Sequence, residues 1–230
     1  KDTWVHDIVC GKKTVSLAIT EPYGGSDVAS LRTTAQRDGD FLVVNGNKTF
    51  ISGGMHADFF TTAVRTGGPG IQGISLVVIP RLTEGVTTTR LTTQGWNCST
   101  TTAIAFHNVR VPTWNLLGEE GKGFLPIMLN FNTERFGMAV GACRMARCCL
   151  EDAVAYAKSR KTFGQSLLAH QVIRHKIAEM VRGTLATHSM ILEVARCMAN
   201  HEREQGKHFE ALAAQVALLK VQATRNMEFC

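Results

Sequence analysis

The hydrophobic residues of this 230-residue chain change their spacing once, close to Gly118. Before that glycine, threonine, valine and isoleucine alternate with polar residues in short runs, which is the period of β-strands. After it, apolar residues recur at intervals of three and four, which is typical of amphipathic helices. The sequence therefore predicts an α+β chain of two domains. A small β-barrel domain over residues 1–118 is followed by an up-and-down α-helical bundle over residues 119–230.

Turn residues divide the first part into eight expected strands, at residues 14–20, 32–36, 41–44, 48–52, 59–66, 74–80, 86–93 and 101–111. Residues 37–40 and the pair Asn45-Gly46 are hairpin signals, because Asn, Asp and Gly tolerate positive φ angles. Short strands at such regular spacing are typical of a barrel or a sandwich.

Three helices are expected in the second part, from about Phe124 to Ser159, from His170 to about Gln205 and from His208 to Phe229. Residues 136–143 carry almost no charge, so we expect that turn of the first helix to be buried on all sides. The expected buried stripe of the same helix consists of Met138, Ala142, Met145, Cys149, Ala153 and Tyr156. Because the helical pattern is still strong at the last residue, we expect the bundle to be incomplete.

Composition narrows the function. The seven cysteines form no C-x-x-C pair, which predicts free thiols in a reducing compartment. No apolar run is long enough to span a membrane, and the first residues do not resemble a secretory signal. The formal charge of +6 is spread along the chain. It supports nucleic-acid binding only weakly and is equally explained by a polyanionic nucleotide cofactor.

Most common catalytic motifs are absent from the sequence. It contains no G-x-x-x-x-G-K-[ST], H-E-x-x-H or G-x-S-x-G, and the eight histidines have no metal-ligand spacing, so no metal is expected. "G-P-G-I-Q-G", residues 68–73, formally matches the dinucleotide fingerprint. Because it joins two predicted strands and opens no helix, we interpret it as a hairpin loop.

Two polar stretches of the β half have both a structural and a chemical explanation. "L-A-I-T-E-P-Y-G-G-S-D-V", residues 17–28, is either an ordinary strand-to-loop junction or a place where hydroxyls and backbone N–H groups converge on a polar ligand. In "N-G-N-K-T-F-I-S-G-G", residues 45–54, Phe50 and Ser52 share one face of a strand. That face suits a flat heteroaromatic ring, although phenylalanine on a strand is more often a core residue.

Two stretches of the helical half likewise have both a structural and a chemical explanation. In "S-R-K-T-F-G-Q-S-L-L-A-H-Q", residues 159–171, the basic residues can simply stabilise a helix C-terminus. In "F-N-T-E-R-F-G", residues 131–137, Glu134 is either an ordinary surface carboxylate or a catalytic base. Neighbours on a helix point about 100° apart, so a direct Glu134–Arg135 salt bridge is not expected.

Taken in order, these stretches resemble the acyl-CoA dehydrogenase family of flavoproteins. "A-I-T-E-P-Y-G-G-S-D-V-A-S" resembles the signature of its middle β-barrel domain, and "F-I-S" stands where the family commonly has W-I-T. "V-R-V-P…N-L-L-G…G-K-G-F" is similar to its barrel-to-bundle crossing, and "R-K-T-F-G…H-Q" to a second flavin-binding segment. The resemblance extends over essentially the whole chain. An N-terminal helical domain and the final helices of the family have no counterpart in these 230 residues.

The resemblance implies an FAD site. Residues that would contact FAD are Leu17, Ile19, Thr20, Ser26, Phe50 and Ser52. The Thr20 hydroxyl would lie near flavin N5, and Ser52 would bind the N5/O4 edge. Arg160, Thr162, Phe163 and Gln171 would reach the FAD of a neighbouring subunit, which implies a homo-oligomer, typically a tetramer built as a dimer of dimers. The usual tryptophan and threonine are replaced by Phe50 and Ser52, which keep an aromatic ring and a hydroxyl.

The implied reaction is α,β-dehydrogenation of an acyl-CoA thioester to the trans-2-enoyl-CoA. A carboxylate removes the α-proton while the β-hydrogen leaves as hydride to flavin N5. Glu134 matches the base position of the isovaleryl-CoA and long-chain enzymes, whereas in many other members the base lies in a later segment. Ser26, Asn132 and Arg135 would contact the coenzyme A chain. A carboxylate of reference pKa ~4.3 is a weak base, so a buried, water-free site is expected around it.

Three alternatives stay open at the level of sequence. The reduced flavin would pass electrons to an electron-transfer flavoprotein in a dehydrogenase, or to oxygen in an acyl-CoA oxidase. A non-catalytic relative would keep the fold and an acyl-CoA site. The expected compartment is the mitochondrial matrix for a eukaryotic source and the cytoplasm otherwise.

Overall fold

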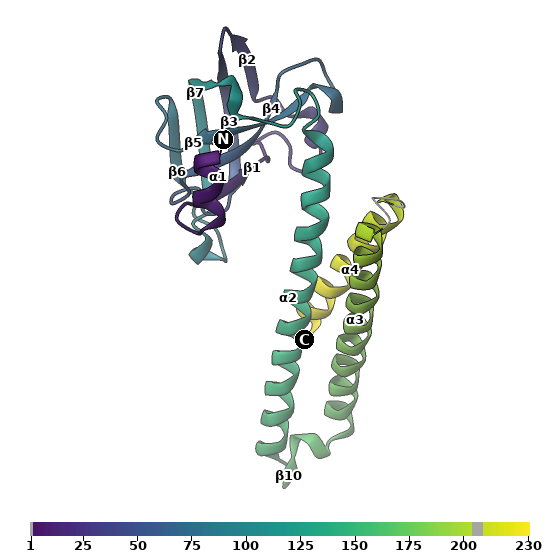
Figure 1. Cartoon of the computed structure of the whole chain (residues 1–230). Coiled ribbons are helices and arrows are strands. Elements are labelled where there is room, and N and C mark those ends of the chain that lie inside the picture. The colour runs from purple at the N-terminus through teal and green to yellow at the C-terminus, as the bar shows by residue number, and fades with distance from the viewer. Residues whose placement is uncertain (1, 204–208) are drawn as a thin grey trace. The chain divides into compact units, whose positions relative to one another are not determined.

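The computed structural model describes residues 2–203 and 209–230 and contains two compact units, residues 1–127 and 128–230. Figure 1 shows strands in the first unit and long helices in the second. The α+β class predicted from the change of period is confirmed. The domain boundary between residues 118 and 119 stays a prediction. The expected helix ends at Gln205 and His208 lie outside the described residues.

One mixed sheet forms the first unit, preceded by the short helix α1 (Asp2–Val9). Its strands are β1 (Val15–Ala18), β2 (Thr34–Asp38), β3 (Phe41–Ile51), β4 (Phe59–Arg65), β5 (Ile74–Pro80), β6 (Val86–Arg90), β7 (Thr102–Pro112) and β8 (Leu116–Leu117). Their order is β6-β7-β3-β2-β4-β5-β8, and β1 pairs in parallel with β4. Residues of six strands share one core around Phe60, Leu42 and Ile104, which is how a barrel-like sheet buries its inner face.

Of the two predicted hairpin turns, one is confirmed and one is wrong. Asp38 pairs with Phe41, so the chain reverses between β2 and β3 as expected. Asn45-Gly46 does not reverse the chain, because β3 is continuous and its register with β7 shifts between Val44 and Gly46. Gly46 has φ +146°, and a Cβ there would lie 2.5 Å from Thr33 Oγ1. The glycine therefore marks a β-bulge with a close backbone approach.

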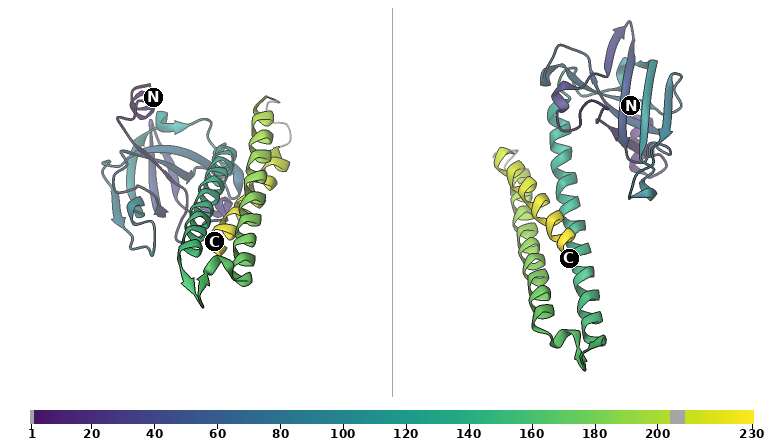
Figure 2. Two further views of the ribbon diagram at one scale, coloured as in Figure 1. Left: turned by 90° about the horizontal axis from the view of Figure 1, so that it is seen from below. Right: turned by 180° about the vertical axis from the view of Figure 1, so that it is seen from behind.

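The described residues of the second unit form three helices, the first of which begins four residues before the unit, with two short strands between the first two helices. Their bounds are α2 (Phe124–Ser159), β9 (Lys161–Thr162), β10 (Gln165–Ser166), α3 (Gln171–Arg203) and α4 (Phe209–Phe229). The predicted bounds of the first helix are confirmed. Figure 2 shows α3 and α4 side by side. One core contains Ala139, Cys143, Val194 and Leu219, so all three helices contribute to it.

The predicted buried face of α2 is wrong by part of a turn. Ala142 of the expected stripe is buried as predicted, and the other buried residues of α2 are Ile127, Asn132, Ala139, Cys143, Ala146 and Ala157. Met138, Met145 and Tyr156 of the expected stripe are 50%, 45% and 61% exposed. The expectation that residues 136–143 are buried on all sides is also wrong, because Val140 is exposed as well. Small residues, rather than large ones, face the other helices here.

All seven cysteines are free, as predicted. Cys143 is buried, and this burial raises the pKa of its thiol. Among the described helices, none is both long and apolar enough to cross a membrane.

Candidate active site

In the β unit, the predicted cofactor residues of two strands lie side by side. The Thr49 amide donates to the Thr20 carbonyl at 2.9 Å, and the Ser16 hydroxyl donates to the Ser52 carbonyl at 2.7 Å. The end of β1 therefore runs along the last residues of β3. Thr20 is half-buried and Ser52 is exposed, so both hydroxyl-bearing residues are accessible from the surface.

The other predicted residues of this segment differ in exposure. Leu17 is half-buried and Ile19 is buried, 5% exposed. Ser26 is exposed in the loop that follows β1. Ile19 therefore supports the surface from the core side, while Ser26 is open to a ligand.

Phe50 is held in an unusual conformation at the surface. Its φ is +57°, and the register of β3 with β7 shifts between Lys48 and Ile51. The residue is 64% exposed, so the core interpretation of this phenylalanine is wrong. A bulky residue in the left-handed region costs on the order of 1–3 kcal/mol, and such strain is concentrated at functional sites. The bulge presents the ring beside Ser52 rather than burying it.

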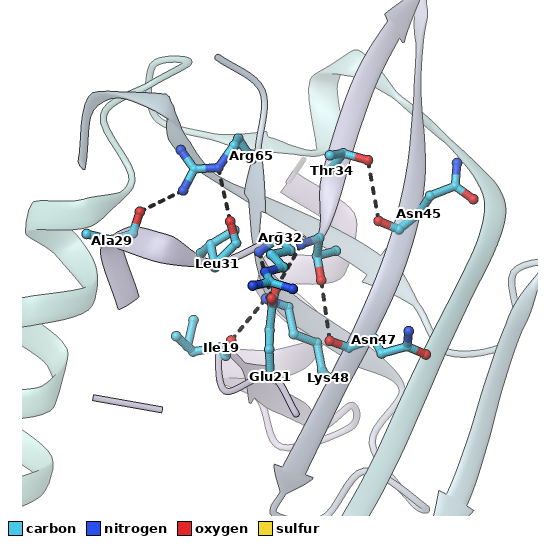
Figure 3. Close-up of polar contacts among 11 residues, drawn as sticks. Ile19, Glu21, Ala29, Leu31, Arg32, Thr34, Asn45, Asn47, Lys48 and Arg65 are labelled. Atoms are coloured by element: carbon cyan, nitrogen blue, oxygen red, sulfur yellow. Dashed lines mark hydrogen bonds and ion pairs between the residues drawn. The ribbon is translucent and has the colours of Figure 1, made fainter. Parts of the chain in front are cut away.

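Directly behind this surface lies a buried ion pair, drawn in Figure 3. Lys48 Nζ donates to Glu21 Oε1 at 2.9 Å and to the Ile19 carbonyl at 3.0 Å. The Glu21 carboxylate also accepts from the amides of Arg32 at 2.6 Å and Thr33 at 2.9 Å. The side chains of Lys48 and Glu21 are 0% and 4% exposed. The carboxylate thus gathers three donors from two separate segments, residues 32–33 and Lys48 of β3.

The two charges shift each other's titration. Burial lowers the pKa of Lys48 to about 8, although the Glu21 carboxylate opposes this effect. For Glu21, burial alone would raise the pKa, but the charge and hydrogen bond of Lys48 and the amides of Thr33 and Arg32 outweigh it. The pKa of Glu21 is therefore lowered. The carboxylate stays ionised at neutral pH and keeps its lysine partner.

Sequence analysis missed this pair for a physical reason. The expected turn at Asn45-Gly46 divided β3 into two short strands, so Lys48 was not counted with Leu42 and Val44, whose inward face it shares by alternation. The bulge that follows Lys48 then turns Phe50 outward and Ile51 inward. The available signal was a lysine inside an otherwise β-branched and aromatic strand.

In the helical unit, the predicted residues after α2 lie on a tight hairpin. Phe163 and Gly164 connect β9 to β10 with φ angles of +51° and +79°, as a type I′ turn requires. Phe163 is 97% exposed, and its ring meets His170 edge-on at 6.2 Å between centroids. Thr162 Oγ1 lies 3.2 Å from His170 Nε2. The hairpin therefore holds a second strained aromatic ring out toward solvent.

The two flanking residues of this segment are both exposed. The Arg160 carbonyl accepts from the Leu167 amide at 2.8 Å, which closes the base of the hairpin. Gln171, the first residue of α3, has its side-chain amide 3.5 Å from His175 Nε2. Both side chains are placed on the same short segment as Phe163.

The residues predicted to act on the substrate occupy neighbouring positions on α2. Glu134 is exposed and accepts from the Asn130 amide group at 2.7 Å. Arg135 donates to Asn132 Oδ1 at 3.0 Å and lies over the Phe131 ring. The described residues include no Glu134–Arg135 salt bridge, as predicted. The expectation of a buried environment for Glu134 is wrong for this chain, because its turn of α2 has one buried and one open face.

Other chemistry has no support in the described part of the chain. No group of three or more His, Cys, Asp or Glu could hold a metal there. The glycine-rich residues 68–73 connect β4 to β5 and end in a 3-10 turn, which confirms the hairpin interpretation. The candidate residues of the β unit supply hydroxyls and one exposed aromatic ring, and those of the helical unit supply a second exposed ring, one carboxylate and two guanidiniums.

Comparison with known proteins is consistent across the whole chain. Residues 16–109 match the family description "Acyl-CoA dehydrogenase, middle domain", and residues 121–230 match "Acyl-CoA dehydrogenase, C-terminal domain". The chain is similar to acyl-CoA dehydrogenase AFT10-1 of Alternaria alternata, with 37% identity over 99% of this chain and 53% of that protein. The β-sheet unit thus corresponds to the middle domain of this family, and the helical unit to its C-terminal domain. The chain belongs to the acyl-CoA dehydrogenase family.

Two solved structures support the same assignment. A probable acyl-CoA dehydrogenase from Mycobacterium abscessus has a TM-score of 0.91 and 44% identity, covering 99% of this chain and 59% of that one. A glutaryl-CoA dehydrogenase from Mycobacterium smegmatis in complex with FADH2 has a TM-score of 0.86 and 28% identity, covering 99% and 56%. The chain spans about half the length of the curated protein above and somewhat more of these structures.

Proposed function

We propose that the whole protein is an FAD-dependent acyl-CoA dehydrogenase that converts an acyl-CoA thioester into the trans-2-enoyl-CoA. Membership of the family supports the reaction class. The observation that carries the proposal is the strained, exposed Phe50 beside Thr20 and Ser52. This conformation costs stability, and the exposed ring beside hydroxyls offers a surface on which a flat ring of a ligand can pack.

The residues of the β unit fit the chemistry of a flavin. An exposed aromatic ring can pack against a flat heteroaromatic system, and neighbouring hydroxyls can bind its polar edge. Thr20, Phe50 and Ser52 would hold the ring, with Leu17 and Ile19 supporting it. Arg160, Thr162, Phe163 and Gln171 would contact the FAD of a neighbouring subunit in a homotetramer. When bound, FAD would accept the hydride that leaves the β-carbon of the substrate.

Glu134 is the proposed base. Its carboxylate would take the proton from the α-carbon as the α,β double bond forms, and it would hold that proton at an oxygen that now accepts from Asn130. Since a carboxylate is a weak base for a carbon acid, the step requires that bound substrate excludes water from this turn. The exposed position of Glu134 leaves that turn accessible to substrate.

Ser26, Asn132 and Arg135 would bind the coenzyme A part of the substrate. Arg135 is already oriented by Asn132 and by the Phe131 ring, so its charge has a defined position for an anionic or carbonyl group. The proposed electron acceptor is an electron-transfer flavoprotein. The proposed compartment is the mitochondrial matrix for a eukaryotic source and the cytoplasm for a bacterial one.

The test uses the full-length protein loaded with FAD and mixed anaerobically with a panel of straight and branched acyl-CoA thioesters. We expect loss of the visible flavin absorbance with at least one thioester, and formation of the enoyl-CoA in equal amount. Slow reoxidation in air with fast reoxidation by electron-transfer flavoprotein would identify a dehydrogenase, and the reverse an oxidase. A protein that binds FAD but is bleached by none of the thioesters would contradict the proposed reaction.

A further inference from the structure

We infer that Glu21 and Lys48 are positioning residues, which fix the surface made by Thr20 and Phe50 from inside the β unit. The inference rests on the proposed function in so far as that surface is assigned to FAD. The pair also fixes the backbone of residues 19–21 against residues 48–50, and this part of the inference does not depend on the ligand.

The first argument is where the hydrogen bonds go. Lys48 Nζ reaches the Ile19 carbonyl and the Glu21 carboxylate, and the next residue, Thr49, donates its amide to the Thr20 carbonyl. Three consecutive residues of one segment are thus tied to two consecutive residues of β3. Figure 3 shows the lysine and glutamate meeting beside Ile19. Because these bonds precede the bulge directly, they fix where Phe50 leaves the strand.

The second argument concerns the loop after β1. Glu21 opens a tight turn in which its amide donates to the Gly24 carbonyl at 3.0 Å and its carbonyl accepts from the Gly24 amide at 3.1 Å. Its carboxylate holds the amides of Arg32 and Thr33, at the far end of the loop that carries Ser26. One buried carboxylate therefore sets both ends of this loop. The same pair that positions Thr20 also restrains the segment of Ser26.

The third argument is energetic. A buried ion pair is weak evidence for stability, because desolvation of the two charges offsets their attraction. Apolar residues of similar volume would serve the core equally well. Apolar residues could not, however, hydrogen-bond the Ile19 carbonyl and the amides of Arg32 and Thr33, which lie in separate segments. The pair is therefore better explained by the positions it imposes than by the stability it contributes.

The chain offers a matched control in Arg65, also drawn in Figure 3. Its guanidinium donates to the carbonyls of Ala29 at 2.7 Å, Leu31 at 3.0 Å and Gly68 at 2.6 Å. It is thus a cation of the same unit that also orders loop backbone. None of its hydrogen bonds reaches Ile19, Thr20 or residues 48–52.

The experiment compares Lys48→Met and Arg65→Met in the full-length protein, with hydrogen exchange and FAD affinity as readouts. In Lys48→Met we expect amides 49–51 to exchange about tenfold faster than in the wild type, which corresponds to the loss of one or two hydrogen bonds. We expect a weaker FAD complex by a similar factor. In Arg65→Met the faster exchange should be confined to residues 29–32 and 66–73, and FAD affinity should fall much less than in Lys48→Met.

Equal exchange of residues 49–51 in wild type and Lys48→Met would overturn the inference. So would an equal loss of FAD affinity in both variants, since that would reflect general destabilisation. If Lys48→Met does not fold, Glu21→Gln keeps one acceptor and serves as the milder variant with the same expected pattern. A wild type that binds no FAD would refute the proposed function, while the exchange data would still decide the positioning role.

Discussion

The candidate residues of the β unit and those of the helical unit are held in place in different ways. In the β unit, the backbone around Thr20 and Phe50 is fixed by hydrogen bonds to a fully buried lysine and glutamate. On α2, Glu134 is exposed, and its carboxylate accepts a hydrogen bond from the side-chain amide of Asn130, one turn earlier. The proposed cofactor surface is therefore preorganised by the core beneath it. The proposed base has only the helix to position it, so its surroundings must be completed when substrate binds.

The largest expected effect on stability comes from removing the buried cation. Lys48→Met leaves the Glu21 charge buried without its partner, which costs about 3–5 kcal/mol of unfolding free energy. All three tryptophans, Trp4, Trp96 and Trp114, belong to the β unit, so tryptophan fluorescence in urea reports on it alone. The control is Arg147→Met, which breaks an exposed pair with Glu151 on α2 and should have a far smaller effect on helical circular dichroism. Similar losses in both variants would contradict the contrast.

The second effect is a pH dependence that belongs to the buried pair. The pKa of Lys48 is about 8 in the folded protein and near 10.5 when unfolded, so between these values the unfolded state binds more protons. The unfolding free energy therefore rises with pH across this window, by up to about 1.4 kcal/mol per pH unit. At acidic pH the relevant group is Glu21, whose pKa is lowered in the folded protein. The ionised carboxylate therefore stabilises the fold at neutral pH, and this stabilisation is lost as the pH falls through the folded pKa.

The measurement is a series of urea titrations of wild type and Lys48→Met across pH 8 to 10.5. The difference between the two proteins isolates the lysine, because all other groups titrate in both. We expect the Lys48→Met curve to lack the rise. A parallel rise in both proteins would show that the slope has another source.

A third prediction tests the packing of the helical unit. A Cβ on Gly183 of α3 would lie 1.9 Å from Oδ1 of the buried Asn226 of α4, whose amide donates to Thr184 Oγ1. Gly183→Ala should therefore cost about 2 kcal/mol through overpacking. In an Asn226→Ala background the same change should stabilise instead, because alanine is the better helix former. Helical circular dichroism during urea unfolding measures both, and equal effects in the two backgrounds would refute the contact.

The smallest expected effect is a gain in stability. Phe163→Asn converts the turn between β9 and β10 into Asn-Gly, the preferred pair for a type I′ turn. Since Phe163 is almost fully exposed, little burial is lost, and relief of the positive φ should add about 1 kcal/mol. The same variant should weaken FAD binding if this ring contacts a neighbouring subunit's cofactor. Unchanged FAD affinity would remove Phe163 from the site.

Local signals in the sequence were sufficient for much of the fold. The bounds of α2 and the hairpin before Phe41 depend on capping, turn residues and period, and both were predicted. The bulges at Gly46 and Phe50 depend on how β3 pairs with β7, which lies more than fifty residues away in sequence. The buried face of α2 was misjudged because that helix has apolar residues on more than one side. The Glu21–Lys48 pair was missed because the expected turn at Asn45-Gly46 separated Lys48 from Leu42 and Val44, with which it shares the inward face of β3.

The most direct measurement is the rate of flavin bleaching by acyl-CoA in Glu134→Gln of the full-length, FAD-loaded protein. The control is Glu151→Gln, which changes another exposed glutamate of α2. We predict that Glu134→Gln binds FAD normally and is bleached about a thousandfold more slowly or not at all, because the α-proton has lost its acceptor. Glu151→Gln should behave as the wild type. Bleaching of Glu134→Gln at the wild-type rate would show that the base is a different residue.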